Sequence, residues 1–106
     1  DDCVRGKIVL TSESGESLTL KITTDLGVNN CKTLGDEARF MDAKQMTLEK
    51  SDDGWRVVHN PNAPNETTLN QKSVAGTSDP LKKGDVVGVG RVSKGVFKLP
   101  LTVGQG

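Results

Sequence analysis

The apolar residues of this chain recur at every second position in several short runs, and this feature constrains the fold more than any other. The alternation is plain in Leu18-Thr19-Leu20-Lys21-Ile22 and in Met46-Thr47-Leu48-Glu49. A period of two is typical of strands with one buried face, whereas an amphipathic helix has a period of about 3.6. The chain is therefore predicted to be all-β.

Turn-forming residues separate these runs at regular intervals. Ser12–Glu16 lies between Lys7–Leu10 and the run at 18–22, and Asp53-Gly54 divides a second pair of runs. Asp-Gly accepts the positive φ of a tight turn, so two hairpins are expected. Turns every 8 to 12 residues or so favour a twisted two-sheet β-sandwich of short antiparallel or mixed strands. Further strands are expected at 68–70, 73–74, 86–89, 91–92 and 96–99.

One stretch departs from this pattern. Residues 36–46 are rich in good helix formers. A lone helix of about this length is marginal unless it is packed. We expect a loop with about one helical turn that leads into the strand at Met46.

The length of the chain fits one domain. With 106 residues there is material for a single core. We assign residues 1–106 to one domain with its core in about 6–103, and residues 1–5 either to its edge or to the end of an upstream linker or module. Aromatic residues make up only 3% of the chain. The core is therefore expected to be aliphatic and anchored by Trp55, Phe40 and Phe97, with Trp55 buried between the sheets.

The charges argue against two classes of partner. Fourteen basic and fourteen acidic residues cancel, which removes the field that would attract nucleic acid or an anionic membrane. No apolar run is long enough to span a bilayer, and no leader is recognisable. We expect a monomeric cytoplasmic domain. Cys3 belongs either to an upstream metal site or to a disulfide with Cys31, and the sequence leaves this open.

The chain lacks the residues that an enzyme brings together. It has one histidine, two distant cysteines and no tyrosine. His59 follows an expected strand and has no acid, base or nucleophile near it in the sequence, so it is interpreted as a strand-end residue. No catalytic residue, metal site or cofactor is predicted.

Three segments carry a resemblance to a known family. They are Gly54-Trp55-Arg56-Val57, Asn65-Glu66-Thr67-Thr68-Leu69-Asn70 and Pro80–Gly90. In order and spacing they resemble the second half of a forkhead-associated (FHA) domain, which has a Trp strand, an Asn-Gly-Thr turn and a late Leu-x-x-Gly-Asp strand. The resemblance implies a β-sandwich that binds phosphothreonine peptides through loops at one end.

The phosphate-reading positions of that family are substituted here. Asp42-Ala43-Lys44-Gln45 stands where Ser-Arg-x-His is common, and Gly27-Val28 stands at the Gly-Arg pair; a second register puts that pair at Gly35-Asp36. Either register loses the arginine. The resemblance implies that the peptide or phosphate contacts come from Val28, Asn29, Asp42, Ala43, Lys44, Pro64 and Asn65.

Two further roles follow for residues around this site. Asn65, Thr67 and Asn70 are expected to fix their turn by hydrogen-bonding its backbone. Lys32, Arg39 and Lys44 are the cations that would compensate for the missing arginine. Two functions stay open: an interaction or scaffolding module in signalling that does not need phosphate, and a phosphothreonine reader in a kinase and phosphatase pathway. The partner is in either case a protein or a phosphopeptide.

Overall fold

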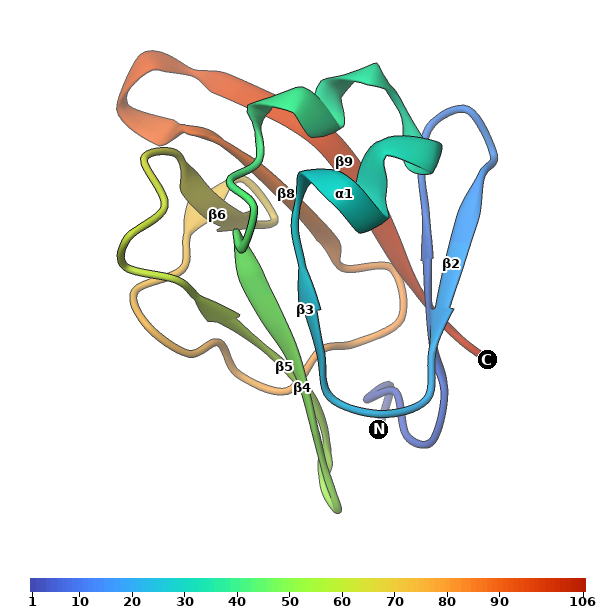
Figure 1. Ribbon diagram of the computed structural model, residues 1–106. Helices are drawn as coiled ribbons and strands as arrows, with labels where there is room; N and C mark the ends of the chain where they lie inside the picture. Colours follow the sequence, from blue (N-terminus) through green and yellow to red (C-terminus); the bar gives the residue numbers. More distant parts are fainter.

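The computed structural model describes residues 1–106 and contains two antiparallel sheets packed face to face (Figure 1). The larger sheet has six strands in the order β2-β1-β9-β8-β6-β7, and the smaller has three in the order β3-β4-β5. The predicted all-β sandwich is confirmed, with only antiparallel pairs. The strands are β1 Ile8–Thr11, β2 Ser17–Leu20, β3 Thr24–Leu26, β4 Met46–Ser51, β5 Gly54–His59, β6 Glu66–Leu69, β7 Lys72–Ser73, β8 Val86–Arg91 and β9 Val96–Gln105.

Strand β9 joins the beginning of the chain to its end. It pairs with β1, where Leu10 faces Val103, and with β8, where Val87 faces Leu101. The predicted first hairpin forms as β1–β2, but β2 ends at Leu20 and the side chain of Ile22 is 73% exposed. The expectation that the alternating run continues to Ile22 is therefore wrong, because the chain has already turned toward the smaller sheet.

The smaller sheet is built on the predicted β4–β5 hairpin, in which Ser51 faces Gly54. Its outer strand, β5, is covered by the segment 76–81. The N–H of Ser78 donates to the carbonyl of Val57 at 2.8 Å, and the N–H of Leu81 donates to that of Trp55 at 2.7 Å. An irregular segment thus pairs with backbone groups at the edge of β5, which would otherwise be open to hydrogen bonds from another chain.

The core between the sheets is aliphatic except for Trp55. This side chain is fully buried and its Nε1 donates to the carbonyl of Gly6 at 2.8 Å, which confirms the prediction for Trp55. Phe40 and Phe97 are only half-buried; Phe40 still packs against the core, whereas Phe97 does not, so the prediction is wrong for Phe97. Phe40 lies at the rim, at the end of a short helical turn, and Phe97 lies near the tip of the β8–β9 hairpin.

Short helical elements connect β3 to β4. They are the α-helix α1 Val28–Cys31 and the 3₁₀ turns η1 Lys32–Leu34 and η2 Asp36–Phe40; a third turn, η3 Val92–Lys94, lies between β8 and β9. Element η2 agrees with the predicted helical turn. Element α1 holds Val28 and Asn29, which the resemblance placed among loop contacts; it was not predicted because the turn is too short to show a helical period in the sequence, and Cys31 anchors it in the core.

The sandwich has two distinct ends (Figure 1). The loop end gathers α1, η1, η2, the loop 41–45, the loop 60–65 and the β8–β9 turn. The terminus end holds both chain termini and the tip of the β4–β5 hairpin; there the N–H of Val4 donates to the carbonyl of Leu81 at 3.0 Å. Cys3 forms an isolated antiparallel β-bridge with Lys82 at the terminus end, while Cys31 lies in α1 at the loop end.

Both cysteine thiols are free, so the disulfide alternative is wrong. The two residues lie at opposite ends of the sandwich, which is too far for the short separation that a disulfide requires. None of the helices has the length and apolar character needed to cross a membrane.

Candidate functional site

The three loops expected to form the site lie together at the loop end. The N–H of Val28 donates to the carbonyl of Asp42 at 3.1 Å, and Gln45 Nε2 donates to the carbonyl of Asn65 at 2.9 Å. These bonds join the start of α1, the loop 41–45 and the loop 60–65. Of the two registers, Gly27-Val28 is the one whose residue bonds the loop 41–45 directly.

Gly27 is required by this arrangement. A Cβ atom at this position would collide with the backbone carbonyl of Ala43. The N–H of Gly27 is held by Asn30 Oδ1 at 2.9 Å, and Asn30 Nδ2 donates to the carbonyl of Asp25 at 2.8 Å. The close approach of two backbones explains why glycine, and no larger residue, precedes α1.

The second register does not reach these loops. Gly35 and Asp36 line a different hollow of about 170 Å³, together with Ser12, Leu34 and Leu99. Its other lining residues belong to the turn between β1 and β2, to η2 and to β9. Asn65 is not among them.

Gln45 is the centre of the loop end, and sequence reasoning gave it no role. Its side chain is fully buried. Its Oε1 accepts from the N–H of Asp42 at 3.1 Å, and its Nε2 donates to the carbonyl of Asn65 and, at 3.1 Å, to Thr67 Oγ1. The amide thus supplies both a donor and an acceptor to the loops 41–45 and 60–65, which belong to no sheet. A polar residue ahead of an alternating apolar strand was the available signal.

Thr67 extends this network to His59. Thr67 is fully buried, and its Oγ1 lies 2.7 Å from His59 Nδ1. His59 is the last residue of β5 and is half-buried. The hydrogen-bonding partner of the imidazole is a hydroxyl, not a carboxylate or a thiol. The arrangement therefore lacks the carboxylate that orients the base in a nucleophilic triad.

Asn65 and Asn70 stand at the two ends of β6 and bond to backbone and side chains around them. Asn65 Nδ2 donates to the carbonyl of Phe40 at 2.8 Å. Asn70 has a positive φ of 51°, and its Oδ1 accepts from the N–H of Val86 at 2.9 Å. Asn tolerates this left-handed conformation better than most residues. These are the bonds by which an Asn fixes a turn.

The residues expected to contact phosphate offer few donors. Val28 is half-buried and packs against the core. Asp42 Oδ2 accepts from the N–H of Lys44 at 3.2 Å, so the carboxylate caps its own loop. Three more of the expected contact residues are exposed and make no side-chain hydrogen bond; these are Asn29, Ala43 and Pro64.

The three expected compensating cations do not converge on Asp42. Lys44 Nζ lies 3.7 Å from Asp25 Oδ2. The guanidinium of Arg39 lies 4.5 Å from the centroid of the Phe40 ring, and its Nη1 donates to the carbonyl of Asp36 at 3.0 Å. Lys32 is exposed at the end of α1 and forms no ion pair.

A cation that sequence reasoning missed is nearer to the expected peptide loop. Arg91, the last residue of β8, donates from Nε to Asn65 Oδ1 at 3.0 Å. The signal was present in the sequence: Val87, Val89 and Arg91 alternate, so an arginine follows two core residues on the same face of one strand.

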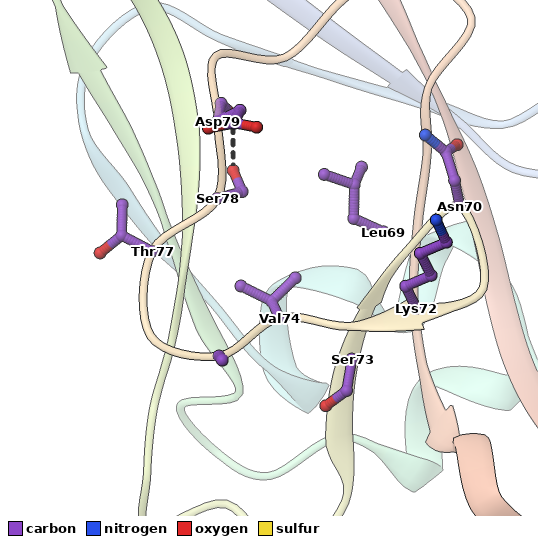
Figure 2. A pocket seen from close by; sticks show the side chains of 9 residues that line it. Leu69, Asn70, Lys72, Ser73, Val74, Thr77, Ser78 and Asp79 are labelled. Carbon is purple, nitrogen blue, oxygen red and sulfur yellow. Dashed lines mark hydrogen bonds between the residues drawn. The ribbon is translucent and has the colours of Figure 1, made fainter.

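The largest hollow of the molecule is elsewhere. It measures about 420 Å³ and is lined by residues between Leu69, the last residue of β6, and Asp79 (Figure 2). Leu69, Val74 and Ala75 form its apolar part, and Lys72, Ser78 and Asp79 are among the polar residues around them. It is open and brings together no acid–base or nucleophilic set. No group of three or more His, Cys, Asp or Glu side chains converges anywhere in the structure.

Cys31 is an unreactive thiol in this setting. Burial raises its pKa from 9.0 to about 11, against a smaller lowering by a hydrogen bond from the backbone around Gly27. A thiol with such a pKa stays protonated at neutral pH and is a poor nucleophile. Cys31 therefore serves the packing of α1.

The comparisons with known proteins agree with this geometry at the level of the fold. No protein-family model and no curated protein matches the sequence. The fold, however, is similar to a solved structure, the solution structure of the FHA domain of an Arabidopsis thaliana hypothetical protein, with a TM-score of 0.69. The chain has an FHA-like fold. The likeness covers 97% of this chain and 88% of that one at 18% sequence identity, so it establishes the fold and not the residues that bind a ligand.

Proposed function

We propose that this chain is a non-enzymatic protein interaction module that binds its partner at the loop end without requiring a phosphate group. The FHA-like fold supports the general class, since its loops gather at one end. The observation that carries the proposal is the pair of residues at the phosphate-reading positions. Val28 has no donor in its side chain, and Asp42 presents a carboxylate.

The electrostatics of these positions oppose a phosphate. A phosphothreonine carries about two negative charges and is bound through charge-assisted hydrogen bonds. A carboxylate and one phosphate charge about 4 Å apart, at an effective dielectric of about 20, repel each other by about 4 kcal/mol. The nearest lysine in the sequence, Lys44, is paired with Asp25. A partner that needs no phosphate avoids this cost.

The direct test compares two peptide libraries. A degenerate phosphothreonine library and its unphosphorylated twin are titrated into the ¹⁵N-labelled domain, and the amide shifts are followed. We expect equal or better binding by the unphosphorylated library, with shifts in residues 27–45 and 60–66. Tight, salt-sensitive binding of the phosphorylated library alone would contradict the proposal.

The second candidate function is a phosphothreonine reader, and it is favoured by the arrangement of the loops around Asn65. If the substitutions at Val28 and Asp42 are what prevents phosphate binding, reversing them restores it. The double variant Val28→Arg/Asp42→Ser is expected to bind a phosphothreonine peptide at least tenfold more tightly than the parent, or about 1.4 kcal/mol. Single variants at the same positions are the matched controls.

We place this module in the cytoplasm as a monomer, as part of the proposal. Its own charges cancel, so it has no general attraction to nucleic acid or to anionic membranes. Selectivity for a partner would then come from local groups at the loop end.

A further inference from the structure

We infer that Arg91 and Arg39 form a relocated anion-binding site at the loop end, which holds an acidic side chain of an unphosphorylated partner segment. This inference rests on the proposed function and names the chemistry of the partner. It follows from how the arginines of the chain are used, and from what surrounds the two that lie at the loop end.

The four arginines of the sequence divide into two kinds. At the terminus end, Arg5 pairs with Asp1 at 2.9 Å and Arg56 pairs with Asp53 at 3.1 Å, in both cases through two nitrogen atoms. At the loop end, neither Arg39 nor Arg91 forms an ion pair. A guanidinium offers five donors in a planar fork, so the unpaired arginines retain most of their capacity to bind a carboxylate.

Arg91 is held in place from one side only. Val87, Val89 and Arg91 share a face of β8. The two valines are buried in the core, and Arg91, the next residue on this face, is exposed at the loop end. The Nε of Arg91 donates to Asn65 Oδ1 at 3.0 Å, while Asn65 Nδ2 donates to the carbonyl of Phe40 at 2.8 Å. The Asn65 amide orients the guanidinium, and neither of its two Nη atoms has a partner within the protein.

Phe40 connects the second arginine to the Asn65 network, because Asn65 bonds its backbone carbonyl and Arg39 lies against its ring. Its ring lies 4.5 Å from the guanidinium carbon of Arg39 and 5.2 Å from Lys98 Nζ. Cations over an aromatic face are favourably placed and keep their hydrogen-bond donors free. Arg39 from η2 and Lys98 from β9 thus lie over the Phe40 ring, and Arg91 from β8 is joined to the Phe40 backbone through Asn65.

The acidic residues nearby bind the backbone. Glu37 Oε1 accepts from the N–H of Leu99 at 2.7 Å, and Glu66 Oε1 accepts from the N–H of Val92 at 3.0 Å. Glu37 is 4.0 Å from Lys98 Nζ, the limit of an ion pair, and no carboxylate reaches Arg39 or Arg91. Asp36 contributes only its backbone carbonyl to Arg39. The acids fix β9 and the β8–β9 turn and leave the guanidinium groups to a ligand.

A peptide carboxylate fits this site better than a phosphate does. A carboxylate accepts two parallel hydrogen bonds from one guanidinium, and Phe40 offers an apolar surface to the methylene groups of a Glu or Asp side chain. A dianionic phosphate gains from the same forks, but with about two negative charges it is repelled by the Asp42 carboxylate about twice as strongly as a peptide carboxylate is. The expected partner is a segment rich in Glu or Asp.

The test uses two peptide pools and the side-chain signals of arginine. One pool of decapeptides has two adjacent Glu residues in random flanks, and the other has Gln at the same positions. We expect the Glu pool to shift the Nε–Hε signals of Arg91 and Arg39, and the Gln pool to leave them unchanged. Arg91→Gln and Arg39→Gln should each weaken binding of the Glu pool at least tenfold, and higher salt should weaken it further.

Two control variants separate charge from fold. Arg56→Gln removes an arginine at the terminus end and should leave binding unchanged. Arg91→Lys keeps the charge without the fork and should retain part of the affinity. Unchanged amide spectra of all four variants outside the altered position exclude unfolding as the cause, and Arg39→Gln keeps the test valid if Arg91→Gln disturbs Asn65.

The outcomes distinguish this inference from the proposed function. Binding of random unphosphorylated peptides that does not depend on Arg91 or Arg39 overturns the inference and leaves the proposed function standing. Binding that shifts residues 69–79 around the largest hollow does the same. Selective binding of phosphothreonine peptides with shifts at Val28 and Asp42 overturns both.

Discussion

The two ends of the sandwich are closed by side chains of opposite character. At the terminus end the indole of Trp55 fills the seam between the sheets and makes one hydrogen bond, to Gly6. At the loop end Gln45 is equally buried but makes three, to Asp42, Asn65 and Thr67. One end is stabilised mainly by apolar burial, and the other by hydrogen bonds that order loops.

The arginine side chains differ between the two ends in the same way. Arginines at the terminus end are paired with nearby aspartates, whereas those at the loop end are positioned but unpaired. An exposed ion pair contributes little to stability, so the pairing at the terminus end mainly removes free charge from that surface. Under the proposed function, the loop end is the surface that stays available for a partner.

The largest expected effect is at the terminus end. Trp55→Ala should lower the free energy of unfolding by about 3–5 kcal/mol, because it removes a large buried side chain and leaves a cavity. Urea denaturation followed by far-ultraviolet circular dichroism measures the change. A midpoint equal to that of the parent would show that the seam at this end does not depend on the indole.

The matching change at the loop end is Gln45→Leu, which keeps the bulk and removes the amide. Leaving the Asp42 N–H and the Asn65 carbonyl without partners should cost about 1–3 kcal/mol. Changes in backbone amide chemical shift between Gln45→Leu and the parent should concentrate in residues 41–45 and 59–67. Shifts spread evenly over both sheets would instead mean that Gln45 acts as an ordinary core residue.

The two asparagines at the ends of β6 refine the comparison. Asn65→Ala and Asn70→Ala should each cost about 1–3 kcal/mol through unpaired backbone and side-chain groups. We expect the larger cost at Asn65, since it is half-buried and Asn70 is exposed. Thermal unfolding of both variants gives the order. If both remain fully stable and only partner binding is lost, the two residues are contact residues.

The smallest effect concerns the thiols. In the native protein a thiol reagent should modify Cys3 quickly and Cys31 only after unfolding, because Cys31 is fully buried. Since its pKa is about 11 in the fold and 9.0 ordinarily, the unfolded thiol loses its proton first. Stability is then complete below pH 9.0 and falls as the pH rises toward 11. Cys31→Ala should abolish this component, and rapid labelling of both thiols would contradict the burial.

The sequence predicted the parts of the fold that depend on local pattern. Alternation and turn residues predicted the β1–β2 and β4–β5 hairpins, and the burial of Trp55 followed from its position on an alternating strand. It did not predict α1, because four residues are too few to show a helical period. It also overestimated how deeply Phe40 and Phe97 are buried, since the hydrophobicity of a side chain does not reveal whether it lies at the rim of the core.

The candidate site was only partly open to such reasoning. The resemblance directed attention to the loops around Val28, Asp42 and Asn65, and the structure brings these loops together. Which of their residues contact a ligand stays a prediction. The role of Gln45 and the position of Arg91 beside Asn65 depend on contacts between residues 20 and 26 positions apart in the chain.

The sequence by itself determined a single β-sandwich, its hairpins and the absence of an arginine at the expected phosphate position, because these depend on residue type and on spacing along the chain. Only the tertiary structure decided which end carries unpaired arginines. Arg5 and Arg56 have aspartates within four residues of them in the sequence, but the surroundings of Arg39 are set by η2 and β9 at Phe40, and those of Arg91 by Asn65. Long-range packing therefore fixes where the charge is free to bind.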